Sequence, residues 1–237
     1  MKRLLYPSCG RDDALYFLKI FMEKIDEFIF ADLNFRSGDI SFFENYLKTL
    51  QKIENLELTI LGDFTGRYIT LFDPGLNKTY RKIAPSYAIF EFTINNQTKR
   101  VILRKGFGQF AILELNDESL DIFIHRGDGT GESGSGIFYL GNRKLKYKPI
   151  SNIFDKLTQK LKNGALIISD GSNVDFKKVN RLYKRIKSLH KKEVKKLLPV
   201  EIKIGNITLR AIDVLDRRYN HTLVWKIEKS KIESNSR

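Results

Sequence analysis

The sequence predicts an α/β fold with a mostly parallel sheet, terminal antiparallel strands and an inserted β-hairpin region. At the N-terminus, a short apolar run stops at a turn-rich loop, a helical pattern follows, and a second apolar run ends on Asp32. Later, the apolar run at 165–170 has the composition of a strand that is buried on both faces of a parallel sheet. The runs at 207–214 and 222–227 then predict closing antiparallel strands.

The first half of the chain opens with a strand–loop–helix–strand unit over residues 3–33. Apolar residues at three- and four-residue intervals predict a helix within 34–55, and a strand follows at 56–61. Two hairpins are expected next, one near 68–72 with its Asp-Pro-Gly turn and one that joins 87–94 to 99–103. We place this β-rich insertion at about 64–105. The segment 106–115 fits either a helix or a strand.

The second half returns to alternating strands and helices. A buried strand is expected at 120–124, and a helix at 150–162 that Asn163-Gly164 would close. A long amphipathic helix follows at 175–198, ended by Pro199, with a further strand at 201–204. These elements predict a single Rossmann-like domain over 1–229, with a frayed tail at 230–237.

Composition and charge narrow the class of protein. The chain has 237 residues, contains no run of about 18 apolar residues, and has one cysteine and three histidines. We therefore expect a cytoplasmic protein with no membrane segment, no disulfide framework and no Cys/His zinc site. The net charge of +14 is uneven: residues 1–63 carry 8 Lys and Arg against 11 Asp and Glu, whereas the remainder carries 34 against 17.

The most basic stretch is the predicted helix at 175–198. Residues 176–198 hold ten Lys and Arg and a single acid, Glu193. A basic face attracts phosphates, so this helix predicts nucleic-acid binding, with Lys184, Arg185 and Lys192 on the solvent side. The alternative is a general compositional bias toward lysine, in which case these side chains form only a solvated face.

The first loop predicts a nucleoside-type ligand. In an open α/β sheet, such a ligand lies over the first loop and the following helix N-terminus, while an acid at the tip of the second strand reaches the ribose hydroxyls. Asp32 follows Gly10 by 22 residues, close to the roughly 20-residue spacing of that arrangement. The alternative is a tight strand-to-helix connection that binds nothing.

A second candidate lies at the end of the strand at 120–124. Five glycines fall within 127–136, which gives the backbone freedom to approach a ligand closely. Asp128 and Glu132 are acid/base candidates, and His125 is the histidine best placed to join them. The segment matches G-x-G-x-x-G, but the extended pattern that follows argues against a dinucleotide fingerprint. A flexible surface loop is the alternative.

Together these features resemble the class I S-adenosylmethionine-dependent methyltransferases over roughly 3–33 and 120–228. The resemblance implies S-adenosylmethionine as cofactor and methyl transfer to an acceptor, for which a nucleic acid is one candidate. By position, the cofactor-binding residues would be Tyr6, Ser8, Cys9, Gly10 and Asp32, and the loop at 125–128 would face the methyl group. The first loop departs from the family in having one glycine where two or three are common.

Two rival functions remain open at this point. One is a non-enzymatic nucleic-acid-binding or regulatory protein on the same fold, since the sequence contains neither a paired-proline aminomethylation motif nor a Pro-Cys nucleophile. The other is a nicotinamide-dependent oxidoreductase.

Overall fold

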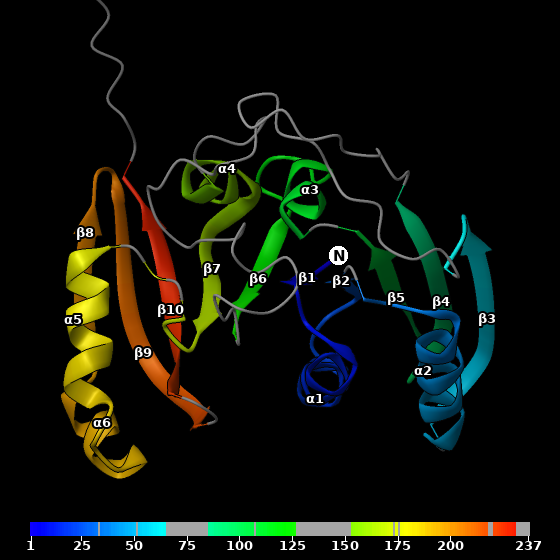
Figure 1. Ribbon diagram of the computed structural model, residues 1–237, viewed down its shortest axis with the longest axis horizontal. Helices are drawn as coiled ribbons and strands as arrows, with labels where there is room; N and C mark the ends of the chain where they lie inside the picture. The colour runs from blue at the N-terminus through cyan, green and yellow to red at the C-terminus, as the bar shows by residue number, and fades with distance from the viewer. Residues whose placement is uncertain are drawn as a thin grey trace, which may run out of the picture.

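The computed structural model describes residues 1–32, 34–50, 52–64, 85–106, 108–126, 153–172, 174, 176–217 and 220–230. In these residues, ten strands form one sheet in the order β3-β4-β5-β2-β1-β6-β7-β10-β9-β8 (Figure 1). Along the chain the elements are β1 (Arg3–Pro7), α1 (Arg11–Phe21), β2 (Glu27–Asp32), α2 (Ser37–Thr49), β3 (Ile53–Leu61), β4 (Ser86–Ile94), β5 (Gln97–Lys105), α3 (Gly108–Leu113), β6 (Leu120–His125), α4 (Ile153–Lys160), β7 (Leu161–Ser169), α5 (Lys177–Ile186), α6 (Lys191–Leu197), β8 (Val200–Ile204), β9 (Ile207–Arg217) and β10 (His221–Lys229).

The sheet is mixed, so the prediction of a Rossmann-like, mostly parallel sheet is wrong. Strands β5, β2, β1, β6 and β7 run parallel to one another, which gives four parallel pairings. Five antiparallel pairings flank them, with β3 and β4 on one side and β10, β9 and β8 on the other. Local sequence patterns identified most of the strands, but they did not reveal how much of the sheet is antiparallel.

The hairpin of β4 and β5 is not an insertion beside the sheet. Its turn lies at Asn95 and Asn96, whose φ angles of 50° and 59° suit a tight two-residue hairpin connection. Strand β5 continues into the parallel group by pairing with β2 along its length. Val101 and Leu103 are fully buried, because they belong to the core cluster that includes residues of α1 and α2. The predicted hairpin at 68–72 lies outside the described residues.

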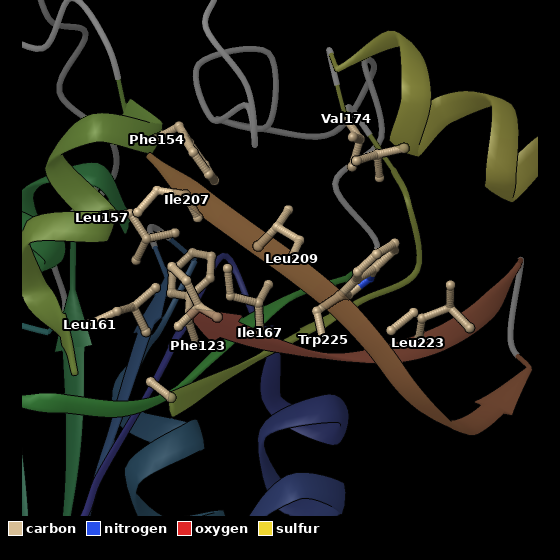
Figure 2. Close-up of a cluster of buried hydrophobic side chains, with 14 of the residues drawn as sticks. Phe123, Phe154, Leu157, Leu161, Ile167, Val174, Ile207, Leu209, Leu223 and Trp225 are labelled. Carbon is tan, nitrogen blue, oxygen red and sulfur yellow. The ribbon is translucent and has the colours of Figure 1, made fainter. Parts of the chain in front are cut away.

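The helices cover both faces of the sheet, and strand alternation supplies one core on each. Leu4 and Tyr6 of β1 belong to the core cluster that includes residues of α1 and α2, whereas Leu5 between them belongs to the cluster that includes residues of α3, α4, α5 and α6. Figure 1 shows α1 and α2 below the sheet and α3 and α4 above it. The larger cluster, around Phe123 and Trp225, is drawn in Figure 2.

The Asn163-Gly164 pair does not close a helix as predicted. Strand β7 begins at Leu161, directly after α4, and includes both residues. The Asn163 side-chain oxygen accepts the Lys229 backbone N–H at 3.0 Å, and Gly164 has a φ of +82°. The pairing of β6 with β7 shifts register at this point, between Leu120 and Ile122. Gly164 therefore lies in a strand irregularity, which is another common place for a glycine with a positive φ.

The single helix predicted at 175–198 is two helices, α5 and α6. The second helix starts afresh after His190, whose backbone N–H donates to the Glu193 carboxylate at 2.6 Å. An acid three residues into a helix is a usual partner for the N-terminal backbone, and it allows the chain to restart a helix there. The predicted apolar stripe is confirmed: Val179, Leu182, Ile186 and Val194 are buried.

Candidate functional site

The carboxyl ends of β1 and β6 define the switch point of the sheet. From β1 the chain passes through α1 to β2 on one side, and β6 lies on the other side of β1 and leads through α4 to β7. The helices that follow β1 and β6, α1 and α4, therefore lie on opposite faces of the sheet beside neighbouring strands. In open sheets with parallel strands, ligands bind outside the carboxyl ends at such a point.

The loop after β1 is bonded to the end of β2. The Ser8 backbone N–H donates to the Ala31 carbonyl oxygen at 2.6 Å, and the Gly10 N–H donates to Asp32 Oδ2 at 2.9 Å. Asp32 Oδ1 accepts the Asn34 N–H at 2.7 Å. The structure thus brings Ser8, Gly10 and Asp32 together, as their sequence spacing predicted.

The carboxyl of Asp32 is an ionisable group that is almost completely buried. The residue is only 8 % exposed, and burial raises the pKa of its carboxyl above the ordinary value of 3.8, against the hydrogen bonds from Asn34 and Gly10. Each carboxylate oxygen has two lone pairs and accepts one of these backbone N–H groups, and the carboxyl also forms a hydrogen bond with the Asn34 side chain. The carboxylate therefore retains capacity for a further donor, such as a hydroxyl.

Gly10 has a backbone conformation that other residues avoid. Its φ of 59° and ψ of 164° lie in a region that only glycine adopts readily, and a Cβ placed there would meet no atom within 4 Å. The glycine is therefore required by its dihedral angles, and the space in front of it is open.

We expect Gly10→Ala to lower the free energy of unfolding by about 1–3 kcal/mol, the cost of forcing a side chain into this conformation. The matched control is Gly38→Ala in the first turn of α2, which also meets open space but has no left-handed φ. That change should be neutral or stabilise by up to about 1 kcal/mol. Chemical denaturation of both variants checks this, and equal effects would contradict the role given to Gly10.

Cys9 and Tyr6, the other two predicted cofactor residues, are buried. Cys9 is 4 % exposed, its thiol lies 3.9 Å from the Ala31 carbonyl oxygen, and burial raises the pKa of the thiol. It is therefore a packing residue and not an activated nucleophile. Tyr6 is fully buried against Phe17, and its hydroxyl lies 3.2 Å from the Arg126 carbonyl oxygen.

Arg126 and Asp216 form a polar cluster that sequence reasoning did not single out. The Arg126 guanidinium is 6 % exposed, donates to Asp216 Oδ2 at 2.8 Å and lies over the rings of Tyr16 and Phe17. The Tyr16 hydroxyl donates to the same Asp216 oxygen, also at 2.8 Å. The cluster joins β6, α1 and β9, which are distant in sequence, so no local pattern could have indicated it.

Acidic side chains gather along this edge of the sheet. Asp12 and Asp13 lie in the first turn of α1, and Asp170, which is 2 % exposed, follows β7. Asp13 and Asp170 both raise the pKa of Tyr6, after the larger effect of burial, so both lie close enough to act on it. Acids in the first turn of α1 oppose a phosphate at that helix N-terminus and favour a ligand that is neutral or cationic.

The predicted catalytic residues are only partly placed. His125 is 1 % exposed at the end of β6, with Nδ1 3.2 Å from the Ser169 hydroxyl on β7. In this position the imidazole contacts the neighbouring strand and is not at a surface. Asp128 and Glu132 lie outside the described residues, as does the rest of the glycine-rich segment at 127–136.

The predicted nucleic-acid residues Lys184, Arg185 and Lys192 are all exposed, on α5 and α6. Among the described residues, no group of three or more His, Cys, Asp or Glu side chains is arranged to hold a metal ion. Over the same part of the chain, no helix is both long and apolar enough to cross a membrane.

A comparison with protein-family models found no match to this chain, and a search of curated proteins found no match either.

Proposed function

We propose that the protein binds S-adenosylmethionine at the carboxyl ends of β1 and β2 and is a methyltransferase-like protein. The observation that carries the proposal is the bond from the Gly10 N–H to Asp32, which joins the first loop to the tip of the second strand beside open space. A carboxylate at this position suits a pair of ribose hydroxyls, because each oxygen accepts a hydrogen bond.

The charge of the edge supports this ligand over a dinucleotide. S-adenosylmethionine has no phosphate and carries a positive sulfonium, whereas nicotinamide dinucleotides carry a negatively charged pyrophosphate. Asp12, Asp13 and Asp32 lie around the start of α1 and would repel that pyrophosphate. We therefore set aside the oxidoreductase alternative.

In the proposed complex, Asp32 accepts the ribose hydroxyls and Gly10 allows the ligand to approach the backbone of the first loop. The bound molecule supplies an electrophilic methyl group. The protein's main contribution is to hold that group in line with an acceptor, which lowers the barrier by positioning. The carboxylate of Asp128 or Glu132 would act as a general base and take up the acceptor's proton where one must leave.

A panel of nucleotides tests this assignment through thermal unfolding. At about 100 times its dissociation constant, a ligand adds about 2.7 kcal/mol of stability, which corresponds to a rise in Tm of about 5–10 °C for a chain of this length. We expect this rise with S-adenosylmethionine and a smaller one with its neutral demethylated product. ATP and NAD should leave the Tm unchanged, and an equal rise with NAD would contradict the charge argument.

A nucleic acid is the partner that the basic segment at 64–237 favours. Residues 64–237 carry 34 Lys and Arg against 17 Asp and Glu, an excess that suits a polyanion. In this proposal the nucleic acid is the methyl acceptor, or else the ligand of a regulatory protein without catalytic activity. Transfer of a labelled methyl group from S-adenosylmethionine to nucleic acid would distinguish the enzyme from the regulatory protein.

A further inference from the structure

The outer surface of α5 and α6 is a continuous basic face. Ten cations on these two helices and their connection are exposed: Lys177, Lys178, Arg181, Lys184, Arg185, Lys187, Lys191, Lys192, Lys195 and Lys196. The apolar stripe is turned the other way and packs in the cluster around Trp225. Figure 1 shows the two helices along one side of the molecule, next to β8 and β9. Burial of the stripe therefore directs the cations to solvent.

Little of this charge is neutralised within the described part of the chain. The single acid of the segment, Glu193, accepts the His190 backbone N–H and so acts as a helix cap. Lys195 pairs with Asp213 at 3.1 Å, the one ion pair that these ten cations form with described residues. Lys191 donates to the Leu215 carbonyl oxygen at 2.6 Å. The remaining cations keep their charge available for an external anion.

The base of this surface is rigidly attached to the carboxyl edge of the sheet. The Tyr183 hydroxyl of α5 donates to the Ser169 carbonyl oxygen at the end of β7, at 2.6 Å. Its ring lies against Gly171, where a Cβ would come within 2.4 Å of the ring. The basic face therefore starts at the same edge of the sheet as the loop containing Gly10.

We propose that the surface of α5 and α6 binds the phosphodiester backbone of a nucleic acid. This inference rests on the nucleic-acid partner proposed above and assigns it a contact surface. Helix α5 has 10 residues and extends over about 15 Å, and α6 has 7 residues and extends over about 10 Å. Duplex DNA carries one phosphate charge per about 1.7 Å of its axis. Several phosphates fall within this length, and cations at that spacing bind without reading sequence.

The test is a variant with three charge reversals, Lys184→Glu, Arg185→Glu and Lys192→Glu. The matched control reverses Lys19, Lys24 and Lys52, which are exposed on or near the α1 and α2 side and form no ion pair with described residues. Both triple variants change the net charge equally. Both should remain folded by circular dichroism, because exposed charges contribute little to stability.

Binding is measured by fluorescence anisotropy with labelled single-stranded and double-stranded oligonucleotides of random sequence, between about 50 and 200 mM salt. Loss of three phosphate contacts should reduce the magnitude of the slope of log affinity against log salt by about 2–3. The affinity at 0.1 M salt should fall on the order of a hundredfold. The control variant should bind within a fewfold of the unaltered protein.

The outcomes separate this inference from the proposal on which it rests. If both triple variants lose affinity equally, the assignment to α5 and α6 is wrong, although the nucleic-acid partner stands. If the unaltered protein retains neither oligonucleotide at the lowest salt, the partner is wrong as well, and binding to anionic phospholipid vesicles alone would point to a membrane surface instead. None of these measurements requires S-adenosylmethionine, so they do not depend on the ligand site.

Discussion

Asp32→Ala is expected to weaken the binding of S-adenosylmethionine at least tenfold. The variant removes the carboxylate proposed to accept the ribose hydroxyls, and hydrogen bonds to a charged group contribute about 1.5–3 kcal/mol each. A loss of 1.4 kcal/mol already corresponds to a tenfold change in the dissociation constant. The variant also leaves the N–H groups of Gly10 and Asn34 without their acceptor, so of the first loop's bonds to β2 only the one from Ser8 to Ala31 remains.

Asp26→Ala is the matched control, because Asp26 also accepts hydrogen bonds that hold the fold together but lies at the opposite edge of the sheet. Asp26 accepts the Lys2 backbone N–H at 2.7 Å and the Lys99 ammonium at 2.9 Å. Lys99 is 1 % exposed, so this variant should lose about 1–3 kcal/mol of stability. The dissociation constant of Asp26→Ala for S-adenosylmethionine should be unchanged. Equal weakening of ligand binding in both variants would mean that Asp32 acts only through stability.

Trp225→Ala is expected to cost about 3–5 kcal/mol of unfolding free energy, the usual range for truncating a buried aromatic residue. Trp225 is 2 % exposed in the larger core (Figure 2), where it packs against Tyr183. Its indole N–H donates to the Tyr183 hydroxyl at 3.1 Å. The truncation therefore also loosens the contact that holds α5 on the sheet.

Trp225→Phe serves as the graded comparison for this residue. It keeps an aromatic ring but loses the hydrogen bond to Tyr183, so we expect a smaller cost, about 1–2 kcal/mol. Trp225 is the sole tryptophan of the chain, so unfolding is followed by circular dichroism and not by fluorescence. A loss below about 1 kcal/mol for the alanine variant would show that the core around β10 is not packed as described.

The parts of the structure that are local in sequence could be predicted. Hydrophobic periodicity placed β1, α1 and β2 in order within 3–33, and it placed the strands near the C-terminus within a few residues of their observed bounds. The spacing of Gly10 and Asp32 predicted that they lie at the same edge of the sheet, because a loop after one strand and the tip of its parallel neighbour meet there; the hydrogen bond between them was not predicted. The exposure of Lys184 followed from the opposite apolar stripe.

The parts that depend on long-range pairing could not be predicted. Nothing in the β4–β5 hairpin indicates locally that β5 pairs with β2, and this pairing places the hairpin within the sheet. The contact of Arg126 with Asp216 joins residues 90 apart in the chain. The break between α5 and α6 was missed because the apolar stripe continues across it. The sequence did contain a signal for a new helix start there, which is Glu193 three residues after His190.

The most direct test of the ligand site is calorimetric titration of S-adenosylmethionine into the unaltered protein. The proposed site predicts heat of binding with one site per chain and a dissociation constant in the micromolar range. The same titration of Asp32→Ala should show at least tenfold weaker binding, and that of Asp26→Ala should match the unaltered protein. The absence of any heat from the unaltered protein at millimolar ligand would contradict the proposed function.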